Sequence, residues 1–252
     1  VAFLEVACTW SRPPDRHTAH YTFQIWNQQL VELYLCTPES VAERVLLFGA
    51  TTWAPGRTWY ITLSNAAAII AEGEVLQLVA INNINIKKRD YIKIIESKTA
   101  ALFSSACEVG GIISNSSKEI NKSLFSFGKN LGTSFQLIDD ALDYSGNSEN
   151  LGKSTGDDFY DGKITLPVII SFEEANENEK YIWKEIFQKK VRNKKDLSTA
   201  NNLIEKHKSI EKTMHLANKY GNKAKKDLSL FSDSPIKKGL INLVDFSLAR
   251  DH

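Results

Sequence analysis

Hydrophobic residues recur every three to four positions from Ser64 to the C-terminus of this chain, and no alternating strand pattern persists there. Helices are expected at 64–81, 90–109, 118–144 and 236–249, and residues 210–231 keep the same period. Thr165 and Pro167 indicate another helix start, and Gly110–Gly111 indicates where the second helix ends. Apolar stripes with this period are buried against one another, so the sequence predicts an all-α helical bundle.

Residues 1–63 break this pattern. Prolines at positions 13, 14, 38 and 55 oppose helices, and RTWYITL at 57–63 favours a strand by propensity. Composition changes as well, because every lysine follows residue 86, whereas four of the five tryptophans precede residue 60. We therefore expect an anomalous segment at 1–63 and a helical domain at 64–252. The alternative for 1–63 is a native, irregular capping segment.

Three aspartates share one side of the helix expected at 118–144. At about 100° per residue, Asp139, Asp140 and Asp143 fall with Gln136 in one arc of roughly 100°, beside an apolar arc. Phe135, in that apolar arc, is expected to belong to the core. Carboxylates this close repel one another, and Mg²⁺, which binds carboxylate and phosphate oxygens, removes the repulsion. The pattern predicts a metal–diphosphate site, and a solvated acidic face is the alternative.

Composition argues against several classes of protein. A net charge of +1 and 42% hydrophobic residues are typical of a globular protein and not of a general nucleic-acid binder. Cys8, Cys36 and Cys107 are widely spaced, which indicates neither a disulfide framework nor a zinc site, and His17 and His20 do not improve the spacing. The sequence has no run of about 18 consecutive apolar residues and no basic segment at its start. We therefore expect no membrane span, no signal peptide and a cytoplasmic location.

Several motifs resemble one family. YIKIIESKTAALFSSACEVGG, GTSFQLIDDALD and LGKSTGDDFYDGKITLP together resemble the trans-polyprenyl diphosphate synthases, especially the bacterial octaprenyl and decaprenyl type, and the resemblance runs from about Ser64 onward. It implies an isoprenoid-synthase-type helical bundle around a central cavity. It also implies a prenyltransferase that uses Mg²⁺ to join an allylic prenyl diphosphate to isopentenyl diphosphate, making a polyprenyl diphosphate such as a quinone side-chain precursor. A homodimer is the family's expected assembly.

The resemblance assigns roles to individual residues. Asp139, Asp140 and Asp143 match the second acidic motif of the family, whose carboxylates bind the metal. Residues expected to contact the diphosphate or its surroundings are Lys98, Thr99, Gln136, Lys153 and Lys163. Asp157 and Asp158 are expected to ligate water around the metal. Glu74 and Gln77 match a cavity-facing pair, with ordinary polar helix positions as the alternative.

One expected motif is missing. The first acidic motif of the family, D-D-x-x-D followed by R-R-G, is replaced by CTWSRPPDRHTAHYTF, where Asp15 is the one acid left. The basic residues that hold isopentenyl diphosphate in the family are expected upstream of Val1. Because RHTAHYTF resembles the text after the missing motif, we hypothesise that residues 1–63 include a frameshifted remnant. Translating the encoding DNA in all three frames tests this, and the absence of an acidic D-D-x-x-D helix from every frame contradicts it.

Two other functions were weighed. LGKSTG is similar to a phosphate-binding loop, but Asn147 stands where that loop needs glycine, and the segment follows a helix instead of a strand. A nucleotidase is therefore disfavoured. The stronger alternative is a non-catalytic subunit of a heteromeric prenyl diphosphate synthase, since such subunits can lack an acidic motif.

Overall fold

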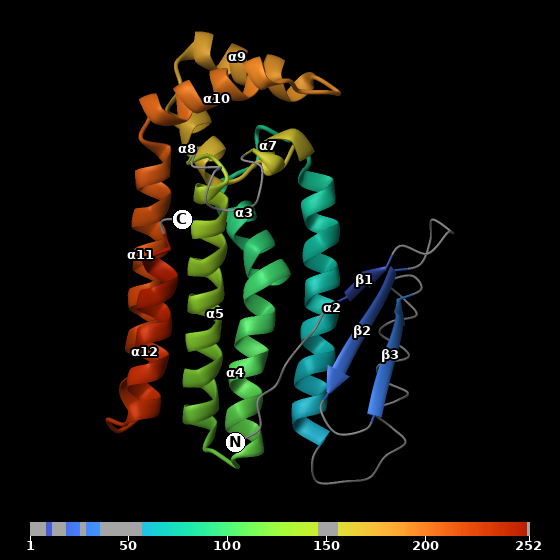
Figure 1. Cartoon of the computed structure of the whole chain (residues 1–252), viewed down its shortest axis with the longest axis vertical. Helices are drawn as coiled ribbons and strands as arrows, with labels where there is room; N and C mark the ends of the chain where they lie inside the picture. The colour runs from blue at the N-terminus through green and yellow to red at the C-terminus, as the bar shows by residue number, and fades with distance from the viewer. Residues whose placement is uncertain (1–8, 12–18, 26–28, 36–56, 146–155, 251–252) are drawn as a thin grey trace. The chain divides into compact units, whose positions relative to one another are not determined.

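The computed structural model describes residues 9–11, 19–25, 29–35, 57–145 and 156–250 (Figure 1). The chain separates into two compact units, Val1–Arg57 and Thr58–His252. In the first unit, β1 (Thr9–Ser11), β2 (Ala19–Ile25) and β3 (Gln29–Leu35) form an antiparallel sheet in the order β1-β2-β3. Sequence patterning did not predict this sheet. Cys8, Asp15, His17 and Cys36 lie outside the described residues, and the structure describes only the backbone of His20.

The second unit is helical throughout its described length, as predicted. Its elements are α2 (Arg57–Ala80), α3 (Lys88–Ile95), a π-helical turn (Glu96–Ala100, the π-turn below), α4 (Ala101–Ile113), α5 (Lys118–Leu142), α7 (Asp157–Asp161), α8 (Leu166–Glu174), α9 (Glu177–Gln188), α10 (Lys194–Lys206), α11 (Ser209–Asp227), a 3₁₀ turn (Leu228–Leu230) and α12 (Pro235–Leu248). Thr165 is the N-cap of α8, as expected.

Three predictions about these elements were wrong. RTWYITL forms the start of α2, because an apolar run of this length extends a helix despite its local strand preference. Gly110 and Gly111 lie inside α4, which continues to Ile113, so these glycines do not end a helix. The helix expected at 90–109 is interrupted by the π-turn. Helices α9 and α10 were not predicted, although Asn176 and Asn193 each form a capping box at their starts.

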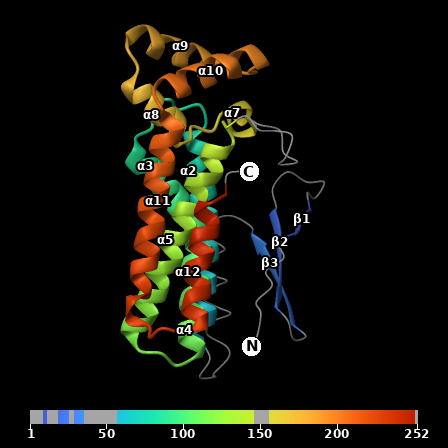
Figure 2. The ribbon, with the colours of Figure 1, turned by 60° about the vertical axis from the view of Figure 1, so that its left-hand side comes forward.

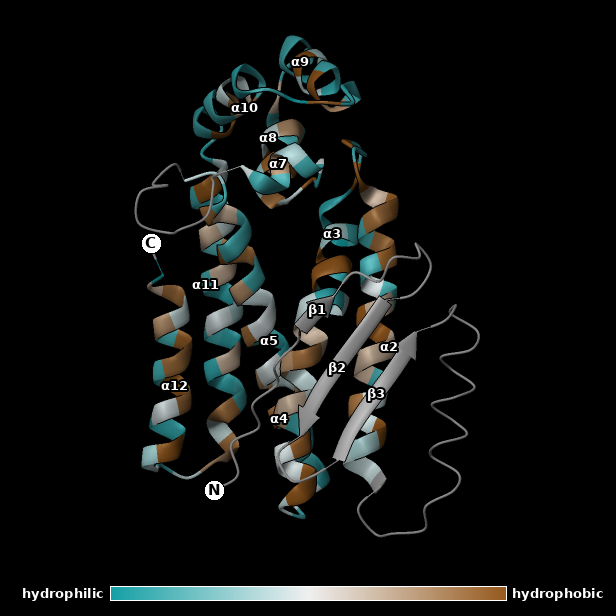
Figure 3. Cartoon of the chain, turned by 45° about the vertical axis from the view of Figure 1, so that its right-hand side comes forward, coloured by the Kyte–Doolittle hydropathy of each residue, from teal (hydrophilic) through white to brown (hydrophobic). Residues whose placement is uncertain are grey.

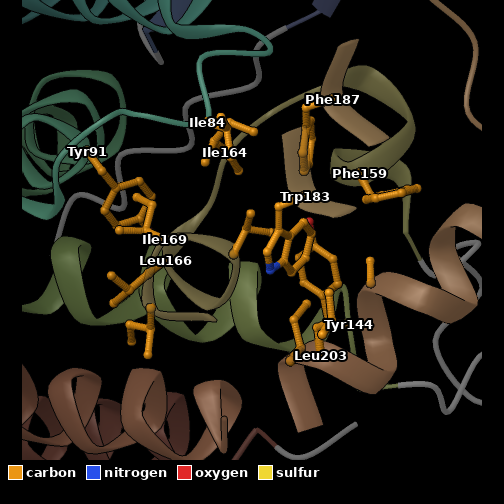
Figure 4. Packing of buried hydrophobic residues seen from close by; sticks show 14 of the residues in the cluster. Ile84, Tyr91, Tyr144, Phe159, Ile164, Leu166, Ile169, Trp183, Phe187 and Leu203 are labelled. Atoms are coloured by element: carbon orange, nitrogen blue, oxygen red, sulfur yellow. The ribbon is translucent and has the colours of Figure 1, made fainter. Parts of the chain in front are cut away.

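Helix α5 is at the centre of the bundle and packs against α4 and α11, while α9 and α10 lie across one end (Figures 1 and 2). Gly132 permits close contact with the π-turn, because a Cβ there would lie 2.8 Å from the Cα of Ala100, and Gly128 permits close contact with α4, because a Cβ there would overlap the carbonyl of Phe103. The main core cluster lies near the α8–α10 end. There Trp183 stacks on Phe187 and Phe159 meets Phe187 edge-on, as Figure 4 shows.

Helix α2 is less buried than the other long helices. Ala66 and Gly73 are its buried positions among residues 58–80, and hydrophobic colour runs along much of its length (Figure 3). Residues Thr58–Ala80 are long and apolar enough to cross a membrane by length and composition, with 11% of the most apolar window buried. This corrects the exclusion of a span from run length alone. Core helices of soluble proteins pass the same test, so the absence of a span stays a prediction.

Candidate active site

A cavity of about 590 Å³ lies where α2, α3, the π-turn, α5 and α7 meet. Its charged and amide-bearing lining residues are Gln77, Lys98, Gln136, Asp139, Asp140, Asp143, Asp157, Asp158, Asp161, Lys163 and Arg250. Most residues predicted for the site therefore share one cavity. Thr99 reaches it indirectly, Glu74 is absent from the lining, and Lys153 lies outside the described residues.

Asp140 is held by a chain of hydrogen bonds on the inner wall of the cavity. Tyr91 donates its hydroxyl to Oδ2 of Asp140, and Gln136 donates Nε2 to Oδ1 at 2.7 Å. Thr99 in turn donates its hydroxyl to Oε1 of Gln136 at 2.7 Å. Burial, followed by repulsion from Asp158, raises the pKa of Asp140 to about 7. Burial also raises the pKa of Tyr91, so its hydroxyl stays a donor.

Asp143 connects α5 to α7. It is the C-cap of α5, its Oδ2 accepts the backbone N–H of Asp158 at 3.1 Å, and its carbonyl accepts the N–H of Gly156 at 2.9 Å. Burial, followed by repulsion from Asp158, raises the pKa of Asp143 to about 6. Gly156, with φ 89°, and Gly162, with φ 79°, bound α7 in a conformation that favours glycine.

Lys163 supplies a cation opposite these carboxylates. Its Nζ lies 2.8 Å from Oδ1 of Asp158 and 3.1 Å from Oδ2 of Asp161. Burial lowers the pKa of Lys163, but the hydrogen bond and charge of Asp158 outweigh burial and hold the pKa above its ordinary value. Lys163 is therefore a permanent cation, available to an anion that enters the cavity.

Lys98 and Thr99 enter the site through the π-turn. This turn contains one residue more than a regular α-helical turn, and π-turns often occur at functional sites. Helix α2 approaches this turn so closely that a Cβ at Gly73 would lie 2.5 Å from the backbone nitrogen of Lys98. Nζ of Lys98 donates to Oε1 of Gln77 at 2.8 Å. Gln77 thus faces the cavity, and Gly73 has a packing role that the sequence did not reveal.

Sequence reasoning missed Tyr91, Asp161 and Arg250. Tyr91 belongs to the helix expected at 90–109, and its hydroxyl is the one signal in the sequence that could have indicated a second role. The guanidinium of Arg250 lies 5.0 Å from the ring centre of Phe135, which is half-buried. Phe135 is in neither of the two core clusters of the described residues, so its expected place in the core stays a prediction. Arg250 follows the last helix, and helical periodicity does not predict where a side chain outside a helix points.

The donor set fits a hard divalent cation that is shared with a ligand. Carboxylates of α5 and α7 line one cavity, and burial, followed by repulsion from Asp158, raises the pKa values of Asp140 and Asp143. Among the described residues, however, no group of three carboxylate, histidine or cysteine side chains closes around a metal position. A cation here would thus take few protein oxygens and complete its shell with water or phosphate, as Mg²⁺ usually does.

Comparisons with known proteins agree with this geometry. The family model of polyprenyl synthetases matches residues 51–204, which begins within the segment first judged unlike the family and contains most of the cavity residues. The chain belongs to the polyprenyl synthetase family. This family consists of prenyltransferases with an all-α fold, which confirms the predicted fold class.

Individual relatives support the same assignment. The octaprenyl diphosphate synthase of Escherichia coli (strain K12) is 38% identical over 190 residues, covering 75% of this chain and 58% of the relative. The crystal structure of a decaprenyl diphosphate synthase from Rhodobacter capsulatus matches with a TM-score of 0.72 and 39% identity, covering 85% of this chain and 62% of that one. A polyprenyl synthase from Caulobacter crescentus, complexed with calcium and isoprenyl diphosphate, matches with a TM-score of 0.74 and 34% identity, covering 84% of this chain and 63% of that one. The chain thus spans less than two thirds of the length of these relatives.

Proposed function

We propose that this chain holds the diphosphate of an allylic prenyl substrate and takes part in its condensation with isopentenyl diphosphate. The observation that carries this proposal is the meeting of Lys98, Lys163 and the acids of α5 and α7 in one cavity. Carboxylates and lysines that face one cavity suit a ligand that brings phosphates together with divalent cations.

The residues divide the chemistry between them. Lys98 and Lys163 stabilise the negative charge that builds up on the leaving diphosphate as the allylic carbon–oxygen bond breaks. The double bond of isopentenyl diphosphate then attacks the allylic cation, and a proton is lost. Thr99, Gln136 and Tyr91 orient Asp140, so that the carboxylate wall has a fixed shape before the substrate enters. Closure of the cavity around the substrate excludes water from the cation.

Mg²⁺ is the cation we propose for this site. It would be held by Asp139 and Asp143, with Asp158 nearby, and it would supply Lewis-acid stabilisation of the diphosphate oxygens. Asp140 is 3% exposed and both its oxygens already accept hydrogen bonds, so it supports the wall instead of offering free ligand atoms. The calcium in the Caulobacter relative is another hard, oxygen-binding cation, in keeping with this proposal.

A long-chain polyprenyl diphosphate, of the kind that precedes quinone side chains, is the proposed product. The octaprenyl and decaprenyl relatives support it. We place the protein in the cytoplasm, in keeping with its composition.

We also propose a homodimer, as the family resemblance implies. The exposed apolar residues of α2, such as Leu78 and Val79 at 65% and 77% exposure, support it. Sedimentation of V79K should then give a monomer. V191K, which changes an equally exposed valine elsewhere, is the control and should leave the dimer intact.

The catalytic proposal is tested with a Mg²⁺-dependent prenyl transfer assay. The chain is assayed alone and then mixed with a full-length homologue that carries an inactivating change. Product from the chain alone supports the enzyme. Product only in the mixture supports the non-catalytic or partial subunit, which the missing first acidic motif favours. Failure to bind inorganic diphosphate with Mg²⁺ contradicts both.

A further inference from the structure

Arg192 lies outside the cavity, in the connection between α9 and α10, yet it contacts two of the segments that form the cavity wall. The residue is 7% exposed. Its Nη1 donates to the carbonyl of Tyr160 at 3.1 Å, and its Nη2 donates to Oδ1 of Asn82. Tyr160 belongs to α7, whereas Asn82 follows the C-terminal end of α2. One guanidinium therefore ties together two segments that lie far apart in the sequence.

The residues on both sides of the contact between Arg192 and Asn82 are closely packed. Asn82 adopts a left-handed conformation with φ 60°, and its backbone N–H donates to the carbonyl of Gly162 at 2.8 Å. A Cβ at Gly162 would overlap the Asn82 amide and would lie 3.2 Å from Nη2 of Arg192, so only glycine fits between them. The guanidinium also lies 4.8 Å from the ring centre of Phe187 and 5.8 Å from that of Phe159.

Burial of Arg192 calls for an explanation beyond stability. In the part of the chain that the structure describes, no carboxylate lies within ion-pair distance of it, and its Nε has no hydrogen-bond partner. Burying a cation without a close ion pair costs folding free energy, and Asp196 attracts the guanidinium only from beyond ion-pair distance. An apolar residue here would avoid that cost but would leave the carbonyl of Tyr160 and Oδ1 of Asn82 without these donors. What the guanidinium supplies is a planar fork that joins two acceptors at a fixed angle.

The segment that it fixes is functional. Residues 158–163 contain Asp158, Asp161 and Lys163, and Lys163 follows directly on Gly162. The N–H of Lys163 donates to the carbonyl of Asp158 at 2.9 Å, so the position of the ammonium depends on the turn that Arg192 and Asn82 hold. We propose that Arg192, together with Asn82, is a positioning residue that locks the α7–Lys163 wall of the cavity. The use of that wall for diphosphate rests on the proposed function.

The hydrogen bonds from Arg192 to Tyr160 and Asn82 are called the clasp below. Hydrogen–deuterium exchange of the full chain without ligands tests the clasp independently of any activity. In R192A, exchange of the amides at 160–163 should rise about tenfold, because the hydrogen bonds that hold the turn closed are lost. K190A changes an exposed lysine of the same connection and should leave these amides unchanged. In an N82G background, which keeps the left-handed backbone, R192A should add less than it does alone.

Chemical rescue separates positioning from a general loss of stability. Millimolar methylguanidinium should restore slow exchange at 160–163 in R192A, whereas R192K, which lacks the fork, should stay fast. Unchanged exchange at 160–163 in R192A, or an equal rise at every amide of the bundle, overturns the proposal.

Binding of inorganic diphosphate with Mg²⁺, measured by calorimetry, adds the functional reading. R192A should weaken binding about tenfold, and methylguanidinium should recover it. Unaltered binding in a variant whose turn exchanges fast overturns the link between the clasp and the ligand. If the unmodified chain binds no diphosphate, the proposed function fails, and the exchange data still decide the clasp.

Discussion

Helices α5 and α2 both contribute residues to the lining of the cavity but are held in place in different ways. α5 has 25 residues, of which 11 are buried, and it packs against α4 and α11. α2 has 24 residues, and Ala66 and Gly73 are its buried positions from residue 58 onward. Two helices of similar length thus bury very different numbers of residues, because α5 is amphipathic whereas α2 is apolar on several sides.

This difference separates two kinds of constraint on the site. On α5 the acids are fixed by side-chain hydrogen bonds, so their chemistry determines what the wall does. On α2 the contact depends on the absence of a side chain at Gly73 and on one hydrogen bond that Lys98 donates to Gln77. Substitutions on α5 should therefore change the charge of the cavity wall, whereas substitutions on α2 should change how closely this helix packs against the π-turn.

The largest expected effect is on the α5 wall. Asp139→Ala should weaken Mg²⁺-dependent binding of diphosphate about a hundredfold, near 3 kcal/mol, because a charged ligand of the clamp is lost. Calorimetry with inorganic diphosphate measures it. Asp233→Ala removes a fully exposed acid outside the cavity and should bind as the unmodified chain does. Equal diphosphate affinities for the unmodified chain, Asp139→Ala and Asp233→Ala would contradict the proposal that α5 binds the metal.

The acids of α5 also predict how stability depends on pH. Folding raises the pKa of Asp140 from 3.8 to about 7, so between these values the folded chain holds a proton that the unfolded chain has released. Without divalent cations, the free energy of unfolding should therefore fall, on the order of 2 kcal/mol, from about pH 5 to about pH 8. Urea unfolding in EDTA measures the fall.

Two controls sharpen this measurement. Asp140→Asn should reduce the fall and leave the smaller part that comes from Asp143, whose pKa burial raises to about 6, and Mg²⁺ should restore stability at the higher pH. The hydrogen bond from Lys206 lowers the pKa of Glu179 to about 2, so that group stays ionised throughout this window and leaves the slope unchanged. Stability that rises with pH would contradict the raised pKa of the buried Asp140 carboxyl.

On α2, Gly73→Ala should lower the free energy of unfolding by about 2 kcal/mol, because the added methyl forces the helix away from the π-turn. Gly239→Ala is the matched control, since a Cβ there meets open space. That change should stabilise α12 by about 0.5–1 kcal/mol. Thermal and urea unfolding compare them, and two changes of the same sign would mean that α2 is not held at Gly73.

The smallest expected effect concerns Gln77. Gln77→Leu removes the acceptor of Lys98 and should weaken diphosphate binding by about 1 kcal/mol, roughly fivefold, by freeing the ammonium. Glu74→Gln changes a neighbouring polar residue that does not line the cavity and should be neutral. Tighter binding in Gln77→Leu would show that the amide competes with the ligand for Lys98.

Much of the helical unit could be predicted because its stripes repeat at 3.6 residues, and the helix at 118–144 was placed almost to the residue. The acids, Lys98 and Lys163 could be named because their spacing matched a family. Tyr91, Arg192 and Arg250 could not, since their roles arise from contacts between distant segments. The strand preference of RTWYITL misled because α2 continues its apolar run across Ser64.

The π-turn has a further consequence for the phase of the helix that carries Lys98. One extra residue in Glu96–Ala100 turns the face of α4 by about 100° relative to α3, so apolar positions before and after it follow two separate registers. Deleting one residue there would convert the π-turn into regular α-helix. Tyr91 and Ala101 would then belong to one continuous helix with a single helical period. The chain of hydrogen bonds from Thr99 to Asp140 would then lose its first member, although the three aspartates of α5 would be unchanged.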